Sequence, residues 1–396
     1  MITSNRISRL MESSSWIRAM FEEGERLKKV YGAGAIFDFT LGNPIAEPPQ
    51  ELKQGLCDMV LSGEQGMHRY MSNSGYEEVR AQIAGFHREN SRLPFTQDHI
   101  IMTVGSAGGI NVALKAILDP GDEVLVLSPF FVEFMFYIEN HGGVMRLVET
   151  TEDFRIDTAA VEAAITEKTR AIIVNSPNNP TGAVYHEDET RALADLLARK
   201  KREGRRVFLI SDEAYRKIIY DGVVLPDAFN LYDDTISVFS HSKDLGLAGE
   251  RIGYIAVSPR LEEAKPLIDA MIFANRILGF INAPALMQRL VGRFQKNSVD
   301  VTGYQEKRDA IYNILVESGF EVQKPEGTFY IFPKSPIEDD VEFIRVMQQH
   351  HILAVPGVGF GRKGYFRIAY CTEMDVIERS RAAFLEVGRL YGLGPG

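Results

Sequence analysis

The chain has 396 residues, 45% of them hydrophobic and 25% charged, and a formal net charge of −10. This length predicts two domains, or one large domain with a smaller lobe, and the acidic balance argues against nonspecific nucleic-acid binding and against a basic membrane-binding surface. Two cysteines, Cys57 and Cys371, are too few for a disulfide framework, which favours the reducing cytoplasm.

The N-terminal segment is predicted to be helical. Its first twenty residues contain no continuous apolar run, so we expect no secretory signal. Ile17, Met20 and Phe21 recur at helical spacing within residues 7–30, which predicts an amphipathic helix. No window of 18 apolar residues occurs in the sequence, so we expect a soluble cytoplasmic protein without a membrane span.

From about residue 100, short apolar runs alternate with helix-like stretches. The runs are "HIIMTVG", "EVLVLSP", "AIIVNSP", "RVFLISD", "TISVFSHS" and "IGYIAV". Such runs, separated by helices, are typical of a buried, mostly parallel sheet. We therefore predict a large α/β domain over residues 45–285, with a mostly parallel sheet flanked by helices.

Beyond residue 285 the pattern changes to a long helical stretch, followed by "GFEVQKPEGTFYIFPK", "VEFIRVMQQHH", "YFRIAYC" and a terminal helix. This order predicts a smaller α+β domain formed by residues 1–44 and 286–396.

Ligands of open α/β sheets bind outside the carboxyl ends of the strands, so the residues after each run are informative. "GSAGG" opens a helix whose N–H groups suit a phosphate, although an ordinary strand–turn–helix has the same pattern. Phe131 either stacks on a planar ring or belongs to the core. "NSPNNPTG" forms a turn or presents an asparagine amide to an oxygen. Asp212 ends a buried strand, where a carboxylate is costly unless paired, and Tyr215 follows three residues later.

"SHSKDLGLAGERIGY" places Lys243 just after a strand, in a glycine-rich segment. A lysine near apolar surface and other cations has a lowered pKa, and a neutral amine is a nucleophile. Alone, Lys243 reads as a surface lysine and Arg251 as an ion-pair partner. Together with the phosphate cradle, the aromatic ring, the amide, the carboxylate and the tyrosine, they fit pyridoxal 5′-phosphate (PLP). No metal site is predicted.

With these motifs in this order, the chain resembles the fold-type I PLP-dependent aminotransferases of class I/II, the aspartate aminotransferase group. The resemblance covers nearly the whole chain and rests on "NSPNNPTG", "SDEAYRKIIYDG" and "SHSKDLGLAGERIGY", with "LGNP", "YMSNSGYEEVRAQIA", "PEGTFY", "VPGVGFG" and "YFRIAY" in further agreement.

The resemblance implies a role for each matching residue. Lys243 forms the Schiff base with the cofactor, Asp212 pairs with the pyridine N–H, and Arg367 binds the substrate α-carboxylate, helped by Asn179 and the Gly42 backbone. Tyr70 reaches the phosphate of a neighbouring subunit, which implies a homodimer with shared active sites. The remaining cofactor contacts fall to the phosphate-binding Ser106, Ala107, Ser240 and Arg251, to Phe131 stacked on the ring, and to Asn179 and Tyr215 on the phenolic oxygen.

Two departures concern substrate choice. The phosphate loop reads Ser106–Ala107 and carries no lysine that could contact an acidic side chain, as some relatives do. Arg276 lies near the place where some aspartate-specific relatives carry an arginine that crosses the dimer, but a surface arginine at a helix end has the same pattern.

The sequence thus predicts an aminotransferase that moves the amino group of an L-amino acid, aspartate or alanine, to a 2-oxo acid such as 2-oxoglutarate. The alternative is another PLP reaction on the same scaffold, such as a C–S lyase or a decarboxylase. A third hypothesis, a non-catalytic transcriptional sensor, requires a DNA-binding domain, which the single N-terminal helix does not supply.

Overall fold

A computed structural model of the protein describes residues 2–13 and 15–394. The chain divides into two compact units. Unit 1 comprises Met1–Asn43, Thr302–Pro325 and Phe329–Gly396, and unit 2 comprises Pro44–Val301 and Glu326–Thr328. The predicted boundary at residue 285 differs from the end of unit 2, because helix α12 (Ala285–Arg293) packs on α4 (Glu77–Ser91) and α3 (Gln50–Leu61).

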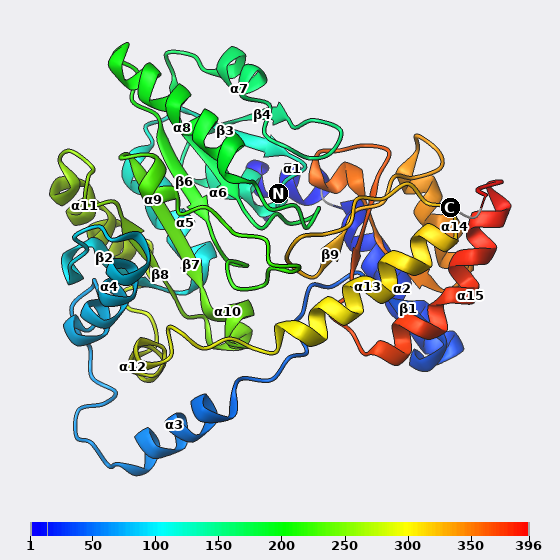
Figure 1. Ribbon diagram of the computed structural model, residues 1–396, viewed down its shortest axis with the longest axis horizontal. Helices are drawn as coiled ribbons and strands as arrows, with labels where there is room; N and C mark the ends of the chain where they lie inside the picture. Colours follow the sequence, from blue (N-terminus) through cyan, green and yellow to red (C-terminus); the bar gives the residue numbers. More distant parts are fainter. Residues whose placement is uncertain (1, 14, 395–396) are drawn as a thin grey trace. The chain divides into compact units, whose positions relative to one another are not determined.

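Unit 2 is built on a seven-stranded sheet with the order β2-β8-β7-β6-β5-β3-β4 (Figure 1). Strands β3 to β7 pair in parallel, whereas β8 pairs antiparallel with both β7 and β2. The strands are β2 (Ile100–Thr103), β3 (Glu123–Ser128), β4 (Val144–Glu149), β5 (Thr169–Asn175), β6 (Phe208–Asp212), β7 (Thr235–Ser240) and β8 (Gly253–Val257). The α/β prediction is confirmed: five of the six apolar runs contain a whole strand, and the sixth, "AIIVNSP", lacks only the first two residues of β5.

Strand β4 is the member of this sheet that the sequence pattern did not predict. It lies at the sheet edge beside β3, and most of its residues are partly or fully exposed. An edge strand with so few buried positions lacks the continuous apolar run that marks the inner strands.

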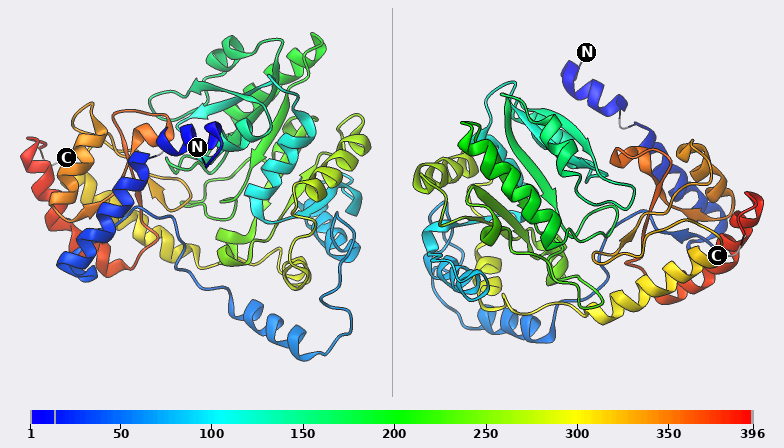
Figure 2. Two further views of the ribbon diagram at one scale, coloured as in Figure 1. Left: turned by 180° about the vertical axis from the view of Figure 1, so that it is seen from behind. Right: turned by 45° about the horizontal axis from the view of Figure 1, so that its top comes forward.

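Side chains that alternate along the strands fill two cores on opposite faces of this sheet, in keeping with the two-residue period of a strand. Val124 and Val126 pack with helices α5 (Gly105–Ile117), α6 (Glu133–Asn140) and α11 (Ala264–Ile277). Leu125 and Leu127 pack with α7 (Thr158–Ala164), α8 (Glu187–Arg202) and α9 (Ala228–Leu231). Figure 2 shows these helices on both sides of the strands. A sheet covered on both faces presents only its strand ends to a ligand, which is where the predicted cofactor residues Asp212 and Ser240 lie.

Unit 1 is an α+β arrangement of short strands and longer helices. β1 (Phe37–Asp38) pairs in parallel with β10 (Ile352–Leu353), and β11 (Val355–Pro356), β12 (Phe366–Ala369) and β9 (Tyr330–Ile331) form an antiparallel sheet. Its core contains the rings of Phe320, Phe343, Phe366 and Phe384, in mutual contact. The helices are α1 (Asn5–Ser13), α2 (Ser15–Tyr31), α13 (Val301–Glu317), α14 (Asp340–Gln349) and α15 (Met374–Leu390). Where the sequence predicts one N-terminal helix, the structure has two, α1 and α2.

Candidate active site

Asp212 ends strand β6 as a buried carboxylate. The Asn175 side-chain amide donates to its Oδ2 at 3.2 Å, whereas its Oδ1 has no hydrogen-bond partner among the described residues. Burial raises the pKa of Asp212 to about 7. A buried carboxylate oxygen without a donor is costly, so this atom suits a ligand with a cationic N–H group. The pyridine nitrogen of PLP is such a group.

Lys243 lies in α10 (His241–Asp244), the short helix that follows β7. Its side chain is half-buried, whereas His241 and Asp244 are buried. The Ser240 hydroxyl caps this turn, because its Oγ accepts from the Ser242 N–H at 3.3 Å. The capped turn at the end of β7 therefore sets the position of Lys243 relative to the sheet.

A concentration of hydrogen-bond donors lies at the start of α5. This helix begins at Gly105 without a side-chain cap, so its first N–H groups remain available to an anion. The Arg251 guanidinium lies over Gly105, and a Cβ added there would come within 2.8 Å of its Nη2. Arg251 Nη1 also donates to Ala248 O at 2.8 Å and to Ser242 Oγ at 3.4 Å. A cation beside an uncapped helix N-terminus and serine hydroxyls is suited to the phosphate of PLP.

The other predicted cofactor residues lie in unit 2 as well. Ser106 and Ala107 are half-buried in the first turn of α5. Asn179 is buried and donates its backbone N–H to Asn175 Oδ1 at 2.8 Å. Tyr215 is buried in the turn after β6, and the half-buried Phe131 ring meets Phe134 edge-on, 5.5 Å between centroids. Tyr70, between α3 and α4, is 87% exposed.

The predicted carboxylate site lies in unit 1. Arg367 in β12 is buried and donates from Nη2 to Thr40 O at 2.8 Å. Its guanidinium carbon lies 4.5 Å from the Tyr330 ring centroid and 4.6 Å from that of Phe360. Aromatic faces hold the flat guanidinium in one plane, which suits two parallel bonds to a carboxylate. A Cβ at Gly42 would overlap the Tyr330 hydroxyl, so glycine is required there.

Two residues outside the predicted set, Asn175 and Ser242, contribute to this geometry. Asn175 contacts both Asp212 and Asn179 and so links two predicted cofactor residues. It is the first residue of "NSPNNPTG", and the motif itself could have indicated it. The Ser242 hydroxyl accepts from Ser240 Oγ at 2.8 Å and from Arg251, so it joins the two sides of the phosphate cradle. Arg276, by contrast, is exposed at the end of α11 over the Phe273 ring.

No helix among the described residues is both long and apolar enough to cross a membrane. Nor do residues 2–13 and 15–394 contain a group of three or more His, Cys, Asp or Glu placed to hold a metal ion.

Comparison with known proteins points in one direction. A sequence model of the family "Aminotransferase class I and II" matches residues 35–383. The probable aspartate aminotransferase of Methanocaldococcus jannaschii is 35% identical over 88% of this chain and 92% of its own, and the aspartate/prephenate aminotransferase of Thermus thermophilus is 31% identical over 88% and 90%. A crystal structure of an amino transferase from Eubacterium rectale superimposes with a TM-score of 0.95 at 35% identity, covering 99% of this chain and 100% of that one.

Proposed function

The chain belongs to the class I and II aminotransferases, and we propose that it moves the amino group of an L-amino acid to a 2-oxo acid with PLP held by Lys243. Aspartate or alanine is the proposed donor and 2-oxoglutarate the acceptor, and the names of the relatives support aspartate. The observation that carries the cofactor proposal is that Oδ1 of the buried Asp212 has no hydrogen-bond partner among residues 2–13 and 15–394.

Asp212, Asn179 and Tyr215 are proposed to orient the cofactor. When bound, PLP withdraws electrons from the bonds at the substrate Cα. The Asp212 carboxylate keeps the pyridine nitrogen protonated, which this withdrawal requires, while Asn179 and Tyr215 donate to the phenolic oxygen. Phe131 covers the ring face. A pyridinium beside Asp212 offsets the burial that raises its pKa, so the carboxylate ionises in the loaded enzyme.

The phosphate is the proposed anchor. It is bound by the guanidinium of Arg251, the hydroxyl of Ser240 and the backbone N–H groups of Ser106 and Ala107 in α5. Lys243 is also the proposed base, since its amine would take up the proton from the substrate Cα. Arg367 fixes the substrate α-carboxylate, with Asn179 and the Gly42 backbone, and so decides which Cα bond reacts.

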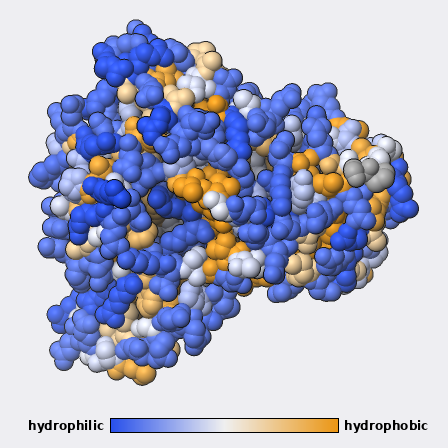
Figure 3. Space-filling view, viewed as in Figure 1, coloured by the Kyte–Doolittle hydropathy of each residue, from blue (hydrophilic) through white to orange (hydrophobic). Residues whose placement is uncertain are grey.

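We further propose a cytoplasmic homodimer with shared active sites. Tyr70 is 87% exposed, as expected of a residue that completes the phosphate site of a second subunit. Near it in the chain, Val60 and Leu61 at the end of α3 are 59% and 82% exposed. Figure 3 shows apolar side chains at this end of α3, at the bottom of the view. Two adjacent exposed apolar side chains near Tyr70 support a subunit contact at this end of α3. Both Cys57 and Cys371 are free thiols, in keeping with the cytoplasm.

The test is to add single L-amino acids, without an oxo acid, to the purified yellow protein. Under the proposal one of them bleaches the visible absorbance, and 2-oxoglutarate restores it. Persistent colour, with pyruvate and ammonia accumulating in the absence of an acceptor, would instead establish the C–S lyase alternative. Evolution of carbon dioxide would establish a decarboxylase. A protein that stays colourless with added PLP overturns the cofactor assignment itself.

A further inference from the structure

The reactive lysine lies on an element that has little stability of its own. Helix α10 is four residues long, a single turn. An isolated turn fixes several dihedral angles for one hydrogen bond and is unstable in water. The position of Lys243 must therefore come from tertiary contacts made by its neighbours in the turn.

Those neighbours, His241 and Asp244, are anchored on both sides. His241 Nδ1 lies 3.2 Å from the Asp244 carboxylate, and its Nε2 lies 3.2 Å from Gln295 Nε2. The Gln295 amide also donates to Val291 O at 2.8 Å. It therefore has one hydrogen left for His241 Nε2, which makes Nδ1 the donor to Asp244.

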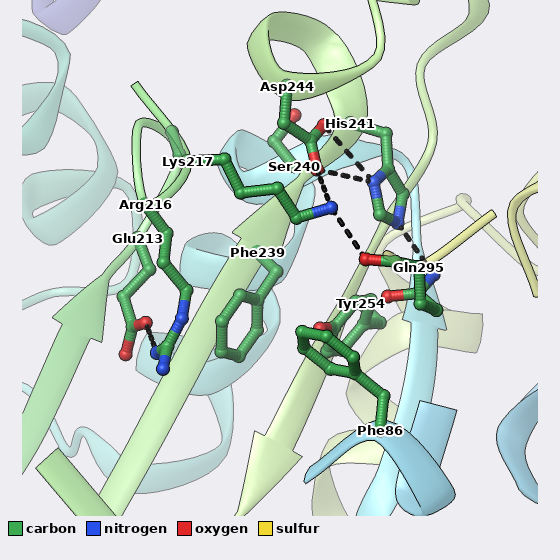
Figure 4. A pocket seen from close by; sticks show the side chains of 11 residues that line it. Phe86, Glu213, Arg216, Lys217, Phe239, Ser240, His241, Asp244, Tyr254 and Gln295 are labelled. Carbon is green, nitrogen blue, oxygen red and sulfur yellow. Dashed lines mark hydrogen bonds and ion pairs between the residues drawn. The ribbon is translucent and has the colours of Figure 1, made fainter. Parts of the chain in front are cut away.

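Lys217 closes this network from the loop after β6. Its Nζ lies 3.1 Å from Asp244 Oδ2 and donates to Gln295 O at 2.6 Å and to Asn297 O at 2.8 Å. The Asp244 carbonyl accepts from Val299 N at 2.7 Å. Residues 295–299 are thus tied to α10 by backbone and side chain together. Figure 4 shows Lys217 and His241 converging on the Asp244 carboxylate.

The network is mostly buried, with the Lys217 side chain 20% exposed and that of Asp244 10% exposed. Its members border a cavity of about 20 Å³, room for about one water molecule. Burial by itself raises the pKa of Asp244, but His241 and Lys217 outweigh burial and hold that pKa below its usual range. Asp244 is therefore a charged group next to the reactive lysine in the chain, and the Lys217 ammonium is paired with it. The titratable groups that face Asp244 or line the same cavity are Lys217, His241, Glu213, Arg216 and Tyr254.

We propose that Asp244 and Lys217 are positioning residues for Lys243: their ion pair fixes the turn that carries the amine and keeps the local charge balanced. This inference rests on the proposed attachment of PLP to Lys243. Neither residue is assigned a contact with cofactor or substrate. Their effect is on where Lys243 lies and on the pH at which its bond to the cofactor takes up a proton.

The experiment compares Asp244→Asn, Lys217→Met and the double variant with the wild-type holoenzyme. Two quantities are measured: the rate of PLP loss on dilution, and the pH midpoint of the visible absorbance of the bound cofactor. Both single variants are expected to lose PLP about tenfold faster. Asp244→Asn leaves Lys217 uncompensated, so its midpoint falls by roughly 0.3–0.5 pH unit, the size expected when one partly screened charge near the cofactor bond loses its partner. Removing Lys217 as well returns the midpoint toward the wild-type value.

Lys200→Met is the matched control. The Lys200 side chain is also mostly buried in unit 2, and its Nζ pairs with Glu162 at 3.0 Å, but it lies in α8 and has no contact with the α10 network. It is expected to change neither quantity. If Asp244→Asn keeps the wild-type midpoint and PLP retention, the inference is wrong. If Asp244→Asn does not fold, PLP loss from Lys217→Met decides alone, because that side chain is 20% exposed and its loss is tolerated better. A wild-type protein that never acquires colour with PLP defeats the proposed function instead.

Discussion

Asn175 donates its side-chain amide to Asp212 Oδ2 at 3.2 Å and leaves Oδ1, on the same buried carboxylate, without a partner in the described part of the chain. One oxygen is therefore held by the protein, and the other is the one that we propose to contact the cofactor. This division of one carboxylate between positioning and binding leads to the first prediction.

Asp212→Asn is expected to inactivate the loaded enzyme while stabilising the cofactor-free protein. Burial raises the folded-state pKa of Asp212 to about 7, against about 3.9 when unfolded. Between these values the unfolded state is ionised and the folded state is protonated, so stability falls as pH rises and levels off above pH 7. Denaturant unfolding of the cofactor-free proteins measures this effect. The difference in unfolding free energy between the variant and wild type should grow in favour of the variant by about 2–4 kcal/mol between pH 4 and pH 8. A gain that is independent of pH would contradict the assignment.

Lys243→Ala is expected to remove the visible absorbance obtained with PLP and to lower kcat by about 10²–10⁴-fold or more, since the amine is both the point of attachment and the base. Absorbance titration with PLP and steady-state kinetics measure the two effects. Lys53→Ala is the control, because Lys53 belongs to unit 2, has a 43% exposed side chain and pairs with Glu47 at 2.9 Å. An alanine variant that still turns yellow would show that another lysine holds the cofactor.

Gly105→Ala is expected to weaken PLP binding about 10–100-fold, because the added Cβ displaces the Arg251 guanidinium from the phosphate cradle. Gly204→Ala separates this effect from backbone strain. Gly204 has φ +86°, close to the +80° of Gly105, but a Cβ there has no neighbour within 4 Å among the described residues. Both variants should lose about 1 kcal/mol of unfolding free energy. Fluorescence titration of the apoenzymes should show weaker PLP binding in Gly105→Ala alone. Equal PLP affinities of the two variants would show that Arg251 does not bind the phosphate.

Arg367→Lys is expected to raise KM for the amino-acid donor about 10–100-fold with a smaller effect on kcat, because an ammonium cannot make the two parallel bonds of a guanidinium. The flat site between Tyr330 and Phe360 also favours arginine. Arg379→Lys, which alters a half-exposed arginine paired with Asp375 in the same unit, should leave KM unchanged. An equally large rise in KM for both variants would show that Arg367 does not bind the substrate α-carboxylate.

Local patterning explains why much of the fold could be predicted. Strands β6 and β7 were predicted because each lies in a short apolar run, and neighbouring residues alone define such a run. Strand β4 was not, because its exposed edge carries no such run. Motif order likewise indicated Lys243, Asp212 and Arg251 as candidates, since each follows a buried strand or a glycine turn.

The sequence by itself determined the α/β class, the family resemblance and the identity of most candidate residues, because these depend on residue type and on short spacings. Only the tertiary structure decided which oxygen of Asp212 stays open, that Arg251 lies over Gly105, and that Lys217 reaches Asp244. Gln295 and His241 are 54 positions apart, and no periodicity links them. Such pairs form only when the packed core brings distant segments together. Buried polar groups cost free energy unless each has a hydrogen-bond partner, and the partner comes from the other segment.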